Sequence, residues 1–245
     1  MRRLLILCLL GGYAVATWSP GMAVWLRMEG NGLDASGNGR TDTLKGSNST
    51  YVAGALGQGI SLPGTDTNFV KLGDVALTDG ATKATWVIRF NEPTIRANGV
   101  LFSSWSDNNS HLIVRKVNTT IPAFYVFVAA SPRDAGHNWG ISNTASYVAN
   151  SWNCLAVVYD GTQPTNATRL RIYLNASELG FASFEGTIPA SLTTVTTNTW
   201  ECGHWEQGAT GYSFNGKLDE FTAWNGKALS VRDIQEVAMG LAPLE

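Results

Sequence analysis

The sequence predicts one large antiparallel β-sandwich that ends in a short helix, and three observations support this fold class. Short runs with alternating apolar and polar residues recur along the chain, separated by Gly, Asn, Asp and Pro. The 26 Gly and 9 Trp among 245 residues favour strands joined by turns. No stretch before the last residues has the spacing of a long amphipathic helix. These features argue against alternating strands and helices around a parallel sheet.

The N-terminal residues predict a secretory signal. Arg2 and Arg3 form a charged start, residues 4–10 form an apolar core, and residues 14–16 read Ala-Val-Ala, a small-x-small cleavage site. The alternatives are a buried strand or a short anchor, but so short an apolar run does not predict a membrane span. We therefore expect a signal peptide at 1–16, a single domain at 17–245, and a secreted or cell-surface protein without stable membrane insertion after signal removal.

About a dozen strands are expected, each from an apolar or alternating run between turn residues. The clearest is ATWVIRF at 84–90, which places Trp86, Ile88 and Phe90 on one side. GISLP and FVKLG are expected to pair around the turn at 64–66. The main expected strands are 23–29, 59–63, 69–73, 84–90, 99–105, 111–117, 123–130, 152–161, 168–175, 199–205 and 216–224.

One helix is predicted near the C-terminus. Ser230 is its expected cap, Asp233 is the acid at the third helical position, and Ile234 and Val237 give it an apolar side. Gly240 is expected to end it.

Charge and cysteine content narrow the function. The net charge is −2 and no cluster of Lys and Arg follows the pattern of a phosphate backbone, so we expect no nucleic-acid partner. After loss of the signal, Cys154 and Cys202 remain. In an oxidising compartment this pair either forms one disulfide or stays as two buried thiols on neighbouring strands.

Six segments in order carry a family resemblance, from about residue 23 to residue 240. They are LRMEGNGLDASGNG, GALGQGISLPGTDTNFVKL, TWVIRF, SWNCLAVVYDG, RLRIYLNASELG and FNGKLDEFTAWNGKALSVRDIQEV. Together they resemble the concanavalin A-like lectin/glucanase superfamily, in its laminin-G-like and pentraxin-like branch. The resemblance implies an all-β, antiparallel jelly-roll β-sandwich with one short C-terminal helix. That fold serves lectins, adhesion domains, virion proteins and glycan-cleaving enzymes, so it does not give the function.

The closing strand decides whether an enzyme is expected. Retaining glycosidases need two carboxylates about 5 Å apart, and the glucanases of the superfamily place theirs at alternate positions of one strand. Here Asp219 and Glu220 are consecutive, and consecutive strand residues point to opposite faces. We therefore expect no catalytic pair and no enzymatic activity.

A structural calcium ion is a second expectation. Calcium takes oxygen ligands, and the glycine-rich loop after the first strand offers Glu29, Asp34 and Asn38. The resemblance adds Asp219, whose counterpart in laminin-G-like domains approaches this loop. Glu29 stands where an Asp is more usual. The alternative is that Asp34 and Asn38 only stabilise turns.

Aromatic residues outside the strand patterns are candidates for glycan contact. We expect Trp105, Trp139 and Trp205, with His204 beside the last, to stack on or contact a sugar ring. The alternative for each tryptophan is packing under its loop or on the sheet. The tryptophans within strand patterns are expected to be core residues; these are Trp25, Trp86, Trp152 and Trp224.

These observations favour a secreted, non-enzymatic recognition domain that binds a glycan or a glycosylated surface. The rival class is a structural, surface or virion protein whose exposed face contacts protein partners. A glycan-cleaving enzyme is the third class, disfavoured by the spacing of the carboxylates.

Overall fold

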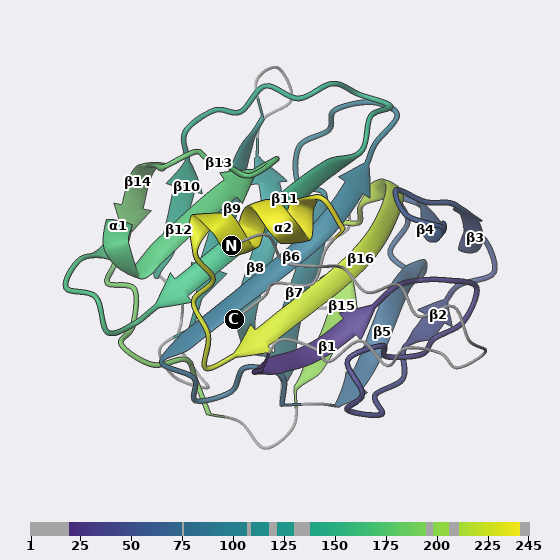
Figure 1. Ribbon diagram of the computed structural model, residues 1–245. Coiled ribbons are helices and arrows are strands. Elements are labelled where there is room, and N and C mark those ends of the chain that lie inside the picture. The colour runs from purple at the N-terminus through teal and green to yellow at the C-terminus, as the bar shows by residue number, and fades with distance from the viewer. Residues whose placement is uncertain are drawn as a thin grey trace, which may run out of the picture.

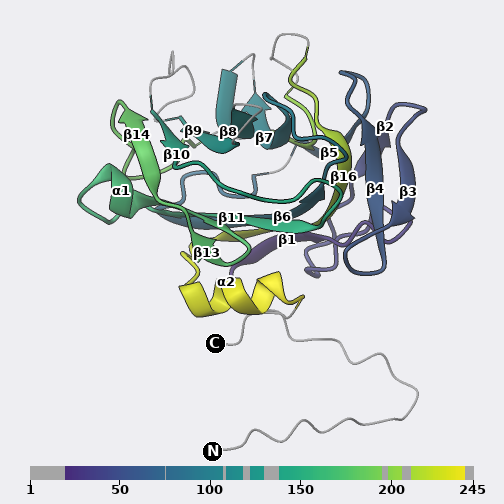
Figure 2. The same cartoon turned by 90° about the horizontal axis from the view of Figure 1, so that it is seen from above.

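A computed structural model describes residues 20–74, 76–106, 109–117, 122–129, 138–194, 198–205 and 211–240 of the chain. Within these residues, two antiparallel sheets of eight strands each pack face to face, and Figure 2 shows the two layers edge-on. The predicted antiparallel sandwich with a short C-terminal helix is thereby confirmed. The signal peptide predicted at 1–16 lies outside the described residues and stays a prediction.

The first sheet has the order β13-β12-β11-β6-β16-β4-β3, and β1 pairs with β16 beside this path (Figure 1). The bounds of its strands are β1 Met22–Leu26, β3 Thr50–Ala53, β4 Gln58–Pro63, β6 Lys83–Asn91, β11 Asn153–Asp160, β12 Leu170–Leu174, β13 Ser177–Glu178 and β16 Asn215–Asn225. A short helix, α1 (Asn166–Arg169), leads into β12.

The second sheet has the order β14-β10-β9-β8-β7-β15-β5-β2. The bounds of its strands are β2 Thr43–Lys45, β5 Phe69–Asp74, β7 Val100–Ser106, β8 Asn109–Val117, β9 Ala123–Val128, β10 Trp139–Ser142, β14 Phe181–Glu185 and β15 Thr199–Cys202. Its inner face meets the first sheet, and its outer face is the surface on which the candidate site is built.

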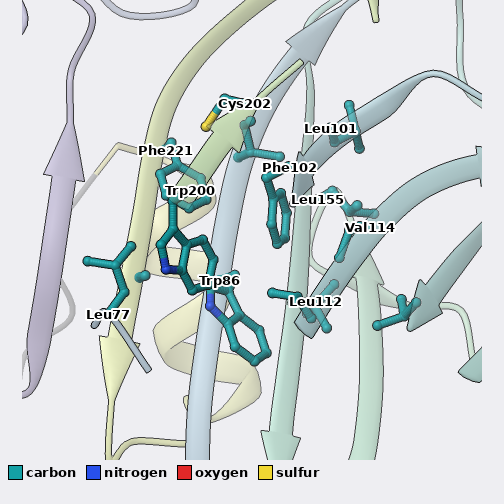
Figure 3. Packing of buried hydrophobic residues seen from close by; sticks show 14 of the residues in the cluster. Leu77, Trp86, Leu101, Phe102, Leu112, Val114, Leu155, Trp200, Cys202 and Phe221 are labelled. Carbon is teal, nitrogen blue, oxygen red and sulfur yellow. The ribbon is translucent and has the colours of Figure 1, made fainter. Parts of the chain in front are cut away.

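The main hydrophobic core lies between the sheets. Trp86 and Phe221 of the first sheet meet Phe102 and Trp200 of the second, and all four side chains are fully buried. Figure 3 shows these rings packed together at the centre of the sandwich. The predicted alternation of the 84–90 strand is confirmed, because Trp86, Ile88 and Phe90 all join this core, while Val87 belongs to a cluster on the outer face of the first sheet.

The predicted pairing of 59–63 with 69–73 is wrong. The strand β4 pairs with β3 and β16 in the first sheet, whereas β5 pairs with β15 and β2 in the second. The turn after β4 therefore carries the chain from one sheet to the other.

The helix α2 (Val231–Ala238) confirms the prediction for the C-terminus. Ser230 Oγ accepts a hydrogen bond from the N–H of Asp233, and the Asp233 carboxylate accepts one from the N–H of Ser230. Gly240 follows the helix with a φ of 81°. Figure 2 shows α2 lying on the outer face of the first sheet. Ile234 is buried there, and Arg89 Nη2 donates to the C-terminal carbonyls of Val237 and Ala238, both at 3.1 Å. No described helix is long and apolar enough to cross a membrane.

Two of the tryptophans predicted as core residues are placed differently. Trp86 and Trp224 are fully buried, but Trp25 and Trp152 are only partly buried. Trp152 lines a cavity of about 410 Å³ between α2 and the first sheet. Trp152 directly precedes β11 and lies outside the strand. The alternation of strand residues between the two faces therefore does not predict whether its side chain is buried.

Candidate functional site

The outer face of the second sheet carries a group of aromatic side chains around one arginine. In β8 and β9 the residues Val114 and Val126 point into the core, so their neighbours Arg115 and Tyr125 point outward. We call the group the aromatic face, and it consists of Arg115, Tyr125, Trp139, Trp205 and Tyr212. All five side chains are partly exposed.

The aromatic face rests on a buried apolar floor. This floor is formed by Val100, Ile113, Phe127 and Ala129, and none of these is more than 6% exposed. The rings pack against this floor and remain partly exposed to solvent.

The side chains of the aromatic face lie in contact range of one another. The ring centroids of Tyr125 and Trp139 are 5.4 Å apart, and those of Trp205 and Tyr212 are 5.5 Å apart at an interplanar angle of 87°. The Arg115 guanidinium carbon bridges the two pairs, 4.6 Å from the Tyr125 centroid and 5.2 Å from that of Tyr212. The result is a continuous aromatic surface with a cation at its centre.

Hydrogen bonding and burial fix the charge state of this surface. Arg115 Nη1 donates to Asn98 Oδ1 at 2.9 Å, which holds the guanidinium between the tyrosine rings. Burial lowers the pKa of Arg115. The guanidinium nevertheless stays charged, because arginine is not deprotonated in proteins. Burial raises the pKa of Tyr125 to about 12, against the opposing charge of Arg115. At neutral pH the site therefore presents a cation and the protonated phenol of Tyr125, which is a hydrogen-bond donor.

Of the four residues predicted to contact a ligand, the structure brings Trp139 and Trp205 into one cluster. Trp105 lies farther along the same sheet, where Lys71 Nζ is 5.9 Å from its ring centroid. His204 is 6% exposed, stacks on Phe69 with centroids 4.6 Å apart, and contacts Glu201 Oε2 through Nδ1 at 3.0 Å. Ligand contact by these four residues stays a prediction.

Sequence reasoning missed three members of the aromatic face, namely Arg115, Tyr125 and Tyr212. The alternation in HLIVRKV and AFYVFVAA was a usable signal for the first two, because it places Arg115 on the face opposite Val114 and Tyr125 on the face opposite Val126. Tyr212 lies outside any strand, so no period pointed to it.

Two of the predicted calcium ligands hold the loop after β1. Asp34 Oδ1 accepts the backbone N–H groups of Trp25 and Ser36, both at 2.8 Å, and Oδ2 accepts the Ser36 hydroxyl at 2.7 Å. Asn38 Nδ2 donates to the carbonyl of Met22 at 2.9 Å. This is the turn-stabilising arrangement open to Asp and Asn side chains.

The other two predicted ligands hold the turn between β3 and β4. Glu29 Oε2 accepts the N–H of Gln58 at 3.0 Å. Asp219 Oδ2 accepts the N–H groups of Ala55 and Leu56 at 2.8 and 3.0 Å. Asp219 thus reaches back from the closing strand to the N-terminal part of the chain, but to a turn later than the predicted loop.

As arranged here, the four residues do not form one calcium ligand set, because Asp34 and Asn38 hold the loop after β1 whereas Glu29 and Asp219 hold the turn between β3 and β4. Over the described ranges, no three His, Cys, Asp or Glu side chains gather as a metal site. Calcium needs six to eight oxygens around one point. A structural calcium ion stays a prediction.

The adjacent acids of the closing strand are separated by a β-bulge. Glu220 has a φ of 53° and the β6–β16 register shifts between Asp219 and Thr222, so regular alternation does not hold at this point. Glu220 accepts a hydrogen bond from Trp25 Nε1 and is 7% exposed, while Asp219 is 0% exposed. Burial raises the pKa of Asp219 to about 7. Each acid has its own protein contacts, and neither carboxyl is open to a sugar ring.

The disulfide between Cys154 and Cys202 that the sequence left open is not formed. Both are buried free thiols. Cys154 packs in the cluster on the outer face of the first sheet, whereas Cys202 packs in the core on the inner face of the second. The first sheet therefore lies between the two thiols. A disulfide would require the Cα atoms of the two cysteines to be within about 7 Å of each other. The other reading, two buried thiols, holds, but on different sheets rather than on neighbouring strands.

The chain was compared with models of protein families and with curated proteins. Residues 63–235 match the family described as concanavalin A-like lectin/glucanases superfamily. No curated protein matches the chain by sequence.

Several solved structures share the fold. Domain 4 of AbnA, a GH43 extracellular arabinanase from Geobacillus stearothermophilus, in complex with arabinotriose, has a TM-score of 0.62 at 17% identity, over 89% of this chain and 98% of that one. The heptameric SAP-like pentraxin of Limulus polyphemus has a TM-score of 0.56 at 17% identity, over 74% and 81%. The binding domain of botulinum neurotoxin DC in complex with SialylT has a TM-score of 0.61 at 15% identity, over 90% of this chain but only 52% of that domain.

Proposed function

The chain belongs to the concanavalin A-like lectin/glucanase superfamily, and from this premise we propose that it is a non-enzymatic glycan-recognition domain that binds through the aromatic face. The observation that carries the proposal is the cluster of partly exposed rings on a packed floor. Such rings stack on the apolar faces of sugars, while phenol and guanidinium groups donate to ring hydroxyls.

The structural relatives support this proposal without deciding it. The arabinanase domain was solved with arabinotriose, so a chain of the same fold and nearly the same extent accommodates a glycan. The toxin binding domain is matched over only 52% of its length, so its ligand carries little weight for this chain. We propose a secreted or surface-bound setting on the basis of the N-terminal residues alone.

Replacing Trp139 or Trp205 with alanine is expected to weaken glycan binding about tenfold or more, because each removes one of the partly exposed rings of the contact surface. The measurement is a glycan array followed by calorimetry on the strongest hit. Trp152→Ala is the matched control, because Trp152 is also a partly buried tryptophan but lines the cavity on the opposite sheet. Its affinity should equal that of the wild type.

Two results would change the proposal. An array that is blank at high protein concentration would favour the rival class, a surface protein that contacts protein partners. Release of reducing sugar from mixed polysaccharides would instead indicate a glycan-cleaving enzyme.

A structural calcium ion has its own test. If calcium binds at Asp34 or at Asp219, added calcium raises Tm and a chelator lowers it, and the difference disappears in Asp34→Asn or in Asp219→Asn respectively. Differential scanning calorimetry with and without calcium measures this. An unchanged Tm in both conditions would remove calcium from the proposal, leaving the hydrogen bonds of Asp34 and Asp219 as the connections that hold these turns.

A further inference from the structure

The central charge of the aromatic face has no acidic partner among the residues that the structure describes. None of the ion pairs among the described residues includes Arg115. Within the part of the chain that the structure describes, the charges or dipoles that act on it appreciably are those of the Tyr212 and Tyr125 phenols. Its one hydrogen-bond acceptor, Asn98 Oδ1, is neutral. Arg115 is therefore a partly buried guanidinium whose charge no described carboxylate balances.

A cation in this position is costly unless something else compensates it. Burial removes water from a charged group, and a carboxylate in hydrogen-bond contact is the usual compensation in proteins. The guanidinium is a planar fork with five N–H donors, and only Nη1 is committed to Asn98. The remaining donors match the two oxygens of a carboxylate in a bidentate arrangement.

The charges around Arg115 favour its Tyr212 side over its Trp139 side as the place where an anion would bind. Glu185 lies opposite Trp139 in the β10–β14 pairing, and its charge acts on Tyr125. An anion at the Trp139 end would be repelled by Glu185. Among the described residues, no acid acts on Arg115 at its Tyr212 side, where Trp205 adds a second ring at a right angle.

Resting on the proposed glycan-binding function, we propose that the ligand is a carboxylated sugar, such as a sialic or uronic acid residue, whose carboxylate binds Arg115. The sugar ring lies against Trp205 and Tyr212, and the neutral part of the glycan extends over Tyr125 toward Trp139. Arg115 is thus the residue that determines specificity for acidic over neutral glycans.

The direct test compares each acid with its own ester on the wild-type protein. The probes are 3′-sialyllactose and its methyl ester, and trigalacturonate and its methyl ester, measured by calorimetry at low and high NaCl. The two members of each pair differ at the carboxyl group, which is an anion in the acid and an uncharged methyl ester in its counterpart. We expect at least one acid to bind roughly ten- to hundredfold more tightly than its ester, and the ratio to shrink in high salt because salt screens the pairing.

Variants then assign the effect to Arg115. Arg115→Gln should reduce the acid-to-ester ratio to about one while retaining the affinity for the ester, and Arg115→Lys should give an intermediate ratio because the charge stays but the fork is lost. Arg232→Gln is the matched control, since this arginine is on the exposed side of α2 with 79% of its side chain accessible. Its ratio should equal that of the wild type. Thermal melts confirm that each variant folds, and the ester comparison needs no variant.

The outcomes separate this inference from the function on which it rests. Equal binding of acid and ester, or an acid preference that persists in Arg115→Gln, overturns the role of Arg115 but leaves glycan recognition in place. Absence of binding to every acidic and neutral glycan tested overturns both.

Discussion

Replacing Glu92 with alanine is expected to lower the free energy of unfolding by about 3–5 kcal/mol, because the change leaves a buried ammonium without a partner. Lys116 occupies an inward position of β8, and its side chain and that of Glu92 are each 1% exposed. Glu92 accepts hydrogen bonds from Lys116 Nζ through one oxygen and from the Tyr147 hydroxyl through the other. Burial lowers the pKa of Lys116 while Glu92 raises it, which shows how strongly the charged form depends on this carboxylate.

A double variant separates the effect of the unpaired charge from that of the cavity that the truncation leaves. Glu92→Gln combined with Lys116→Met removes both charges and is expected to recover most of the loss. Glu236→Ala serves as the surface control, because the Arg232–Glu236 pair on α2 includes a 79% exposed arginine and should contribute less than about 1 kcal/mol. Urea unfolding followed by tryptophan fluorescence measures all four proteins. A loss below about 1 kcal/mol for Glu92→Ala would show that the ammonium finds water or another acceptor.

Local features of the fold could be predicted from the sequence, and its long-range pairings could not. The helix α2 depends on Ser230 and Asp233, which lie three residues apart, and the 84–90 strand shows its own alternation. The pairing of β4 could not be inferred in this way, because its partner β16 lies about 150 residues away. A Gly-containing turn permits both a hairpin and a crossing between sheets, and only the hydrogen-bonding partners of each strand decide between them.

Members of the candidate site could be predicted where a single residue type pointed to ligand contact. They were missed where the site depends on residues from separate segments coming together. Trp139 and Trp205 stood out as tryptophans next to turns. The role of Arg115 depends on Tyr125 from the next strand and on Tyr212 from a segment almost 100 residues later. Lys116 shows the same limit, because alternation places it inward but only the folded chain brings Glu92 to it. Charged residues at inward positions are therefore the places where sequence patterns need tertiary contacts to be interpreted.

The second large effect concerns Asp42, a carboxylate at the edge of the second sheet. Both of its carboxyl oxygens are buried without a hydrogen-bond partner, and its backbone N–H donates to the carbonyl of Gly32 at 2.9 Å. Burial raises the pKa of Asp42 from 3.8 to about 6. The titratable groups on which its charge acts are Tyr51 and Cys202, and neither is a cation that could stabilise the carboxylate.

This raised pKa makes stability fall as pH rises. Between pH 4 and pH 6 the folded chain retains a proton on Asp42 that the unfolded chain has lost, so each step up in pH favours unfolding until the folded pKa is passed. One pKa unit corresponds to 1.36 kcal/mol, so a rise of about two units lowers the free energy of unfolding by about 3 kcal/mol by pH 8. Asp42→Asn, which cannot ionise, is expected to be more stable than the wild type by about 2–3 kcal/mol at pH 8 and to match it near pH 4.

Denaturant unfolding of both proteins across pH 4 to 8 tests this, and Asp160→Asn provides a control of opposite sign. Burial acts to raise the pKa of Asp160, but hydrogen bonds from Thr162 and Gln163 and the nearby Lys83 outweigh it and lower the pKa overall. Its charged form therefore stabilises the fold above pH 4, and Asp160→Asn should be less stable than the wild type at pH 8 and approach it as pH falls. If the Asp42→Asn difference is the same at every pH, the two oxygens are hydrated or bind a cation in solution. The carboxylate would then be compensated by solvent or by an ion rather than left uncompensated in the fold.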